Sequence, residues 1–335
     1  MKALDTWERV LIGLIALVYL CFGLTVDNFL SPYALADSTF NFSEKALIAL
    51  AMALLIVAGE IDLSVAATMA LASLAMGYAM QAGASLPVML LAAVATGVAC
   101  GALNGWLVTR WKLPSIVVTI GTLSLYRGLA LVLLGDQAIT GYPEALSTWG
   151  NGSLGDLFGL EDPTRLIVPI EFAVMLLATL VVGLFLHRSV MGRRIYAIGA
   201  NPIASRFSGI AVDRYRMGLF VFAGVMAALA AILLTGRIGS TRPNLAMGWE
   251  LDAITIVILG GVAIEGGRGS IVGVALAAVL MGAFTFALGM LNVAGIVMSM
   301  IVGMLLIVAM VLPRWLRRRP SAPAAPSAPT AARAA

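Results

Sequence analysis

Long apolar runs separated by short polar segments dominate the chain. A helix needs about 20 mostly apolar residues to cross a bilayer, and helices are favoured because lipid cannot hydrogen-bond free backbone groups. The segments that approach this description, two of them short, are 10–26, 45–59, 64–80, 86–108, 116–135, 167–186, 217–235, 251–264, 271–291 and 295–312. The pattern therefore predicts an all-α polytopic membrane protein with about ten transmembrane helices.

Composition and charge agree with this class. Of the 335 residues, 61% are hydrophobic and only 11% are charged, against roughly 25% charged in a soluble domain. This balance excludes a water-soluble enzyme, and the net charge of +4 does not suggest a nucleic-acid partner. Lysine and arginine residues near span ends are retained in the cytoplasm. Most of the 21 lysines and arginines fall on the cytoplasmic side if both termini are cytoplasmic, so we expect this orientation.

The cysteine and histidine residues do not predict a metal or cofactor site. Cys21 and Cys100 both lie within apolar runs, and His187 is the chain's one histidine. These residues offer neither a disulfide framework, nor a metal site, nor a catalytic triad. We therefore expect no cofactor, no metal and no catalytic residues.

The predicted spans divide into two halves of five helices around residue 200. Glycine-containing acidic breaks at 59–64 and 265–270 each adjoin a short span, and short interrupted spans in corresponding positions are typical of internally repeated transporters. We expect one transmembrane domain over 1–313, with a cytoplasmic loop at 187–216. The segment 314–335 is basic and then rich in Pro and Ala, which predicts a disordered cytoplasmic tail.

The first break carries Glu60, Asp62 and Ser64. A carboxylate at membrane depth costs about 2.5–3.5 kcal/mol, so two of them need a reason. In one interpretation Gly59 ends a helix and Asp62 or Ser64 caps the next. In the other, the break lines a cavity and binds substrate or an ion. The structural interpretation is favoured, and the second stays open.

Other polar side chains lie within the spans themselves. Asn104 adjoins a glycine ladder in the fourth predicted span, formed by Gly97, Gly101 and Gly105. Thr119, Thr122 and Arg127 lie in the fifth predicted span. A buried arginine must be paired or hydrated. Structural pairing and a place in the translocation path are both compatible with these residues.

The cytoplasmic loop is more apolar than a simple connector. It places Ile195, Tyr196 and Phe207 among arginines, and Asn201-Pro202 predicts a helix start. Either a docking surface or an amphipathic helix on the lipid headgroups would produce this pattern. The chain has no P-loop, so any ATP would be hydrolysed by a partner.

Taken together, these motifs resemble the permeases of monosaccharide ABC importers, the group that includes the ribose, xylose, arabinose, rhamnose and autoinducer-2 permeases. The resemblance covers about residues 10–313 and rests on Glu60-Ile61-Asp62-Leu63-Ser64, Asn104-Gly105, 113–122, Tyr126-Arg127-Gly128 and 192–201. It is strongest toward the rhamnose permeases, through 41–46, 135–138, 239–243 and 248–251.

The resemblance implies a bacterial inner-membrane permease subunit that imports a sugar, rhamnose or a similar monosaccharide. It implies a second permease copy, identical or not, separate ATP-binding cassette ATPase subunits and a periplasmic sugar-binding protein, all within membrane lipid. The residues implied in ATPase coupling are Gly192, Arg193, Arg194, Tyr196, Ala197, Gly199, Asn201, Ala204 and Gly209. Those expected to meet the binding protein are Glu44, Lys45, Arg237, Arg242, Glu250 and Asp252.

Three alternatives remain at this stage. The chain could serve autoinducer-2 or another sugar, or it could be a proton-coupled secondary transporter using Glu60, Asp62 or Glu171. A membrane scaffold without cargo is the third, but it gives the helix breaks and the amphipathic loop no purpose.

Overall fold

The computed structural model describes residues 6–158, 167–304 and 307, and over these residues the regular secondary structure is almost all helix. The predicted tail, 314–335, lies outside the described residues. The labelled helices are α1 (Thr6–Thr25), α2 (Pro32–Phe40), α3 (Ser43–Val57), α4 (Val65–Gln81), α5 (Leu86–Arg110), α6 (Ser115–Leu134), α7 (Glu144–Asn151), α8 (Leu154–Leu157), α9 (Ile170–Arg188), α10 (Val190–Ala200), α11 (Pro202–Phe207), α12 (Val212–Ile238), α13 (Trp249–Leu259) and α14 (Ile271–Met290). A further apolar helix is Gly295–Met304.

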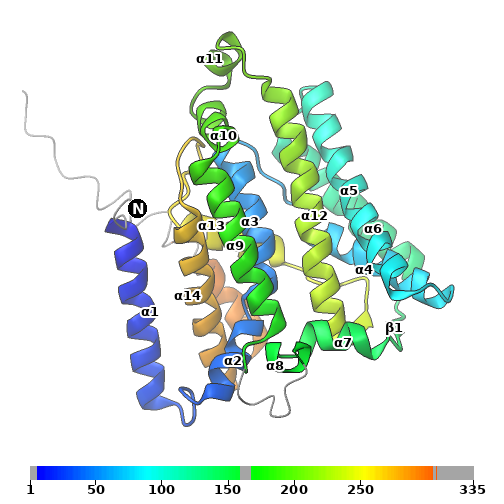
Figure 1. Cartoon of the computed structure of the whole chain (residues 1–335), viewed down its shortest axis with the longest axis vertical. Coiled ribbons are helices and arrows are strands. Elements are labelled where there is room, and N and C mark those ends of the chain that lie inside the picture. Colours follow the sequence, from blue (N-terminus) through cyan, green and yellow to red (C-terminus); the bar gives the residue numbers. More distant parts are fainter. Residues whose placement is uncertain (1–5, 159–166, 305–306, 308–335) are drawn as a thin grey trace, which may run out of the picture.

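The bundle has two different ends (Figure 1). Helices α10 and α11 lie at one end, and α2, α7 and α8 lie at the other. Strands β1 (Ile139–Thr140) and β2 (Ser240–Thr241) also lie at the second end, where they pair antiparallel. This two-residue antiparallel pairing joins segments about a hundred residues apart in the sequence, and no sequence pattern predicted it.

The core of the bundle is built around α3 and α12. Every residue of α3 from Ala46 to Val57 is buried, and α12 packs against α3, α4 and α5. Small residues allow the closest of these contacts, because a Cβ at Gly97 or Gly101 on α5 would overlap the backbone oxygens of Gly224 or Phe220 on α12. The predicted glycine ladder therefore serves packing within the chain.

Each of the ten predicted spans contains helix among the described residues, but the helices differ in length. Among the described residues, six are long and apolar enough to cross a membrane, or up to seven if the bent pair α2 and α3 forms one span. Helix α13 ends at Leu259 rather than 264, because Gly260 and Gly261 begin a turn. Its 11 residues extend only about 16 Å, half of a bilayer's hydrocarbon core. The number of ten spans and the cytoplasmic termini stay predictions.

Candidate functional site

Helices α10 and α11 form because each has a side-chain cap at its start. The Ser189 hydroxyl accepts a hydrogen bond from the Gly192 amide at 2.9 Å, and Asn201 Oδ1 accepts one from the Ala204 amide at 2.9 Å. Pro202 occupies the first turn of α11, where its missing N–H costs nothing. The helix start predicted at Asn201-Pro202 is confirmed.

The two helices present different faces to the bundle and to the outside. Ile195 and Ile198 of α10 are fully buried against the bundle. Arg193, Arg194, Ala197, Asn201, Ala204 and Gly209 are all exposed. On α11, Ile203 is 67% exposed and Phe207 is 90% exposed. The outer face, which we call the α10–α11 surface (Arg193, Arg194, Ala197, Ile203 and Phe207), thus combines cations with uncovered apolar groups.

Three residues implied in coupling instead face the chain itself. A Cβ at Gly192 would overlap the Leu186 carbonyl oxygen. The Tyr196 hydroxyl donates to the Gly269 carbonyl oxygen at 2.7 Å, and burial raises the Tyr196 pKa to about 12. Gly199 lies against the Val57 carbonyl oxygen, where a Cβ would overlap it. These three residues position α10 rather than form its outer face.

The two glycine-containing breaks meet at the end of α10. The Gly267 amide donates to the Val57 carbonyl oxygen at 2.8 Å, which ties the second break to the end of α3. A Cβ at Gly266 would lie 3.1 Å from the Gly199 carbonyl oxygen and 3.2 Å from Gly59 Cα. We call this contact of Gly59, Gly199, Gly266 and Gly267 the glycine junction. Gly59, Gly266 and Gly267 all have a positive φ, which explains why glycine occupies them.

The carboxylates of the first break are both held by neighbouring groups. Asp62 Oδ1 accepts from the Ser64 amide at 2.8 Å and from the Ser64 hydroxyl at 2.7 Å, and Asn104 Nδ2 donates to that hydroxyl at 2.8 Å. Asp62 thus bonds to Ser64, the N-cap residue of α4, and neither side chain makes the cap hydrogen bond that the structural interpretation expected. Glu60 forms an ion pair of 2.8 Å with Arg216 of α12.

The polar residues of α6 divide between two sites. The Thr119 hydroxyl donates to the Ser115 carbonyl at 2.8 Å and lies 3.3 Å from that of Ile61, beside the first break. The Thr122 hydroxyl lies 3.4 Å from the Thr119 carbonyl. Arg127 lies apart from this group, and its Nη1 donates to the Pro243 and Leu245 carbonyls at 2.7 and 2.9 Å. Arg127 therefore braces the loop after β2.

The charges expected to meet a binding protein lie toward the opposite end, and most are paired. Arg237 donates to both Glu44 oxygens, at 2.8 and 3.1 Å, so Glu44 is buried at 1% exposure rather than available at the surface. Lys45 and Asp252 form an ion pair of 2.6 Å. Glu250 is half-buried and Arg242 is exposed. The docking role of the group stays a prediction.

Two partners in these sites escaped the sequence analysis. Arg216 was not among the predicted site residues, although it pairs with Glu60. Ser115, whose hydroxyl accepts from the Ile61 amide at 3.2 Å, entered only as part of the segment 113–122 that carries the family resemblance. Neither has a local signal, because both partners lie more than fifty residues away along the chain.

Comparison with known proteins identifies a membrane permease. The family model described as "branched-chain amino acid transport system / permease component" matches residues 35–310. The "Autoinducer 2 import system permease protein LsrD" of Escherichia coli K12, of Escherichia coli O9:H4 (strain HS) and of Shigella flexneri is in each case 34% identical over 331 residues, or 94% of this chain and 97% of the relative. No solved structure matches the chain.

The chain belongs to this permease family. It is a multi-pass protein of the bacterial inner membrane, and its class is a permease rather than an enzyme. The resemblance to permease subunits of monosaccharide ABC importers is confirmed. Kinship with rhamnose permeases is not supported, because these relatives are named for autoinducer 2.

Proposed function

We propose that the chain is the membrane subunit of an ATP-driven importer and that its cargo is autoinducer 2 or a related small sugar. A separate ATPase would bind the α10–α11 surface, and a periplasmic binding protein would deliver the cargo at the opposite end. A second permease copy would complete the pathway. The observation that carries the proposal is the match to autoinducer 2 permeases over 94% of the chain.

The α10–α11 surface has the features of a protein-docking site. Phe207 is 90% exposed and Ile203 67% exposed, and exposed apolar groups rimmed by charge mark interaction sites. A helix lying on lipid headgroups would turn such residues toward the bundle's lipid boundary. In Figure 1, α11 instead projects beyond the end of the bundle. This placement favours docking of a soluble partner.

The glycine junction suggests how motion of a docked partner would reach the permeation pathway. Gly199 of α10 touches the backbone at the end of α3 and the segment around Gly267. Because backbone packed this closely cannot compress, displacement of α10 would shift both segments. Glu60 and Asp62 follow directly after α3, so the first break would move with them. Small shear motions of packed helices are a common form of such switching.

The binding-protein side is proposed with a narrower set of residues than the sequence suggested. Glu44 with Arg237, and Lys45 with Asp252, already satisfy one another. A partner that used these charges would first have to break the ion pairs. We therefore assign initial docking to exposed Arg242.

Co-purification with the ATPase encoded beside the chain tests the proposal. Phe207→Ala should weaken ATPase association at least tenfold, because aromatic anchors dominate interfaces. Tyr33→Ala is the matched control, since Tyr33 is an exposed aromatic (65%) on α2 at the opposite end. Unchanged association of Phe207→Ala would contradict docking at this surface.

Uptake of labelled autoinducer 2 by proteoliposomes separates the proposal from proton-coupled transport. With binding protein and ATPase present, uptake should require ATP and should persist largely in Asp62→Asn, because the amide oxygen of asparagine can still accept from the Ser64 amide. Complete loss of uptake in a well-folded Asp62→Asn, or uptake driven by a proton gradient without the ATPase, would favour an ion-coupled carrier.

A further inference from the structure

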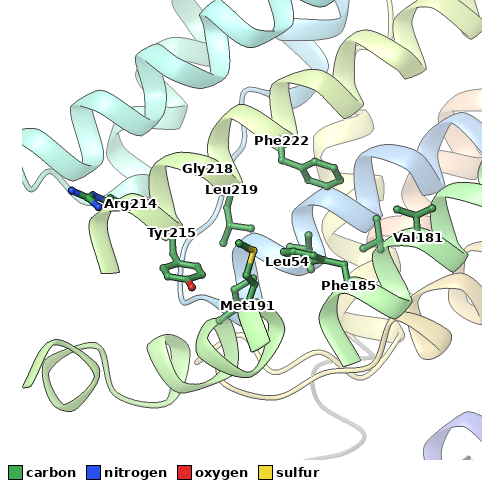
Figure 2. Close-up of a pocket in the computed structure, with 11 residues that line it drawn as sticks. Leu54, Val181, Phe185, Met191, Arg214, Tyr215, Gly218, Leu219 and Phe222 are labelled. Carbon is green, nitrogen blue, oxygen red and sulfur yellow. The ribbon is translucent and has the colours of Figure 1, made fainter. Parts of the chain in front are cut away.

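An apolar pocket of about 600 Å³ lies beside α10, between α9 and α12 (Figure 2). Its walls come from four helices, with Leu54 of α3, Phe185 of α9, Met191 of α10 and Leu219 and Phe222 of α12. The volume falls within the roughly 300–1,000 Å³ of small-molecule sites. The proposed function uses none of these side chains as contacts for cargo or ATPase.

The pocket opens onto an apolar surface of α9, a helix long and apolar enough to cross a membrane. Val181 and Met191 line it and are also 57% and 54% exposed. The same side of α9 continues as exposed leucines, Leu177, Leu180 and Leu184. A sugar would lose the hydrogen bonds of its hydroxyls in such surroundings. The available apolar ligand along this surface is an acyl chain.

Positive charge borders the pocket at the α10 end. Arg214 is exposed at the start of α12 and lines the pocket's edge, with its side chain directed away from the apolar residues in Figure 2. The Tyr215 hydroxyl accepts a hydrogen bond from Arg194 at 2.9 Å, which brings a second guanidinium to this edge. The adjacent carboxylate, Asp213, is already paired with Lys112 at 2.7 Å and Arg206 at 2.9 Å. The edge therefore has cationic charge available for an anion.

We propose that this pocket binds an anionic glycerophospholipid, with one acyl chain between α9 and α12 and the phosphate at Arg214 and Arg194. Basic pockets between helices at a membrane surface are suited to anionic headgroups. Met191 and Ile195 of α10 also line the pocket. The bound lipid therefore braces α10 in the position that the glycine junction requires.

Native mass spectrometry of the full chain in detergent tests this inference without any ATPase or cargo, so its failure is independent of the proposed function. The probes are dioleoyl phosphatidylglycerol and dioleoyl phosphatidylcholine, and sn-glycerol 3-phosphate serves as a competitor without acyl chains. Arg214→Gln should reduce the preference for phosphatidylglycerol about fivefold. Arg110→Gln, an exposed arginine at the end of α5 outside the pocket, is the matched control and should retain the preference.

A second pair of variants tests the acyl-chain part. Gly218 lines the pocket with open space around it, so Gly218→Leu should fill the pocket without disturbing the fold and lower phosphatidylglycerol affinity at least tenfold. Gly13→Leu on α1, where a Cβ also meets nothing within 4 Å, should bind as the unaltered chain does. Thermal unfolding without added lipid verifies that both variants fold. Equal binding of the two lipids, competition by sn-glycerol 3-phosphate, or unchanged binding in Gly218→Leu would each overturn the inference. So would a change of oligomeric state in Gly218→Leu in place of lost lipid, since it would make the pocket an interface between copies.

Discussion

Gly199 lies where α10 touches the backbone of two other segments. Replacing its hydrogen by a methyl group in Gly199→Ala would ordinarily favour the helix by about 1 kcal/mol. Here the methyl group would overlap the Val57 carbonyl oxygen and lie 2.5 Å from the Gly267 nitrogen. We expect a net loss of about 1–3 kcal/mol, the usual cost of overpacking. A lower midpoint of thermal unfolding in detergent would show it.

Gly121→Ala provides the control for this substitution. Gly121 is also inside a helix, α6, but a Cβ there meets nothing within 4 Å. Its alanine variant should therefore be as stable as the unaltered chain or slightly more stable. If Gly199→Ala and Gly121→Ala unfold at the same temperature, the claim that Gly199 has no room for a methyl group at the glycine junction is wrong.

Local signals predicted single residues well only where the partner is near in sequence. The acidic break predicted the helix end at Gly59, which has φ of 81°, because that depends on residues a few positions away. The cap predicted at Asp62 or Ser64 was wrong, because Ser64 is the N-cap of α4 without a side-chain cap hydrogen bond and Asp62 bonds to Ser64 itself rather than to an amide within the helix. The partner of Glu60 could not be predicted, since Arg216 lies on α12 and no pattern connects the two. Burial of Glu44 was missed for the same reason.

At the scale of helices, hydropathy located the long apolar helices. It predicted neither their exact ends nor the shorter elements between them. All ten predicted segments contain helix, yet α12 extends to Val212–Ile238 against a prediction of 217–235. Its first five residues include Asp213, Arg214 and Arg216, which an apolar window excludes although nothing stops the helix. Helices α2 and α7 and the β1–β2 pairing lie in segments too polar or too short for such a window.

A buried charge cluster joins three of these helices. Arg237 of α12 holds Glu44 of α3 through two hydrogen bonds, and its Nε lies 3.9 Å from Glu171 of α9. Glu171 is fully buried, and its oxygens have no hydrogen-bond partner among the described residues. One guanidinium thus faces two carboxylates.

Substitutions of Arg237 and of Glu171 should differ in their effect on stability. Arg237→Gln would leave two carboxylates buried without their cation and should cost about 3–5 kcal/mol. Glu171→Gln keeps the size of the side chain and removes a carboxylate close to Glu44, so it should leave stability unchanged or raise it. Thermal unfolding of the two variants in the same detergent measures the difference. Equal destabilisation by both would mean that Glu171 is needed as a charged partner of Arg237.

Exposed charged side chains are distributed asymmetrically between the two ends of the molecule. Exposed arginines gather at the α10–α11 end, where α10, α11 and the start of α12 carry Arg193, Arg194, Arg206 and Arg214. Exposed acidic residues such as Glu144 and Asp156 lie on α7 and α8 at the other end. Because basic residues near span ends are retained in the cytoplasm, this asymmetry predicts that α11 is cytoplasmic and α7 periplasmic.

Single-cysteine labelling of spheroplasts tests this orientation. The native thiols are first removed as Cys21→Ser and Cys100→Ala, since Cys21 is exposed. Ser147→Cys on α7 and Ser208→Cys directly after α11 then form a matched pair, both at exposed serines. A membrane-impermeant maleimide should modify Ser147→Cys in intact spheroplasts and Ser208→Cys only after the membrane is permeabilised. The reverse pattern would place the α10–α11 surface in the periplasm, out of reach of any ATPase, and the proposed coupling would fail with it.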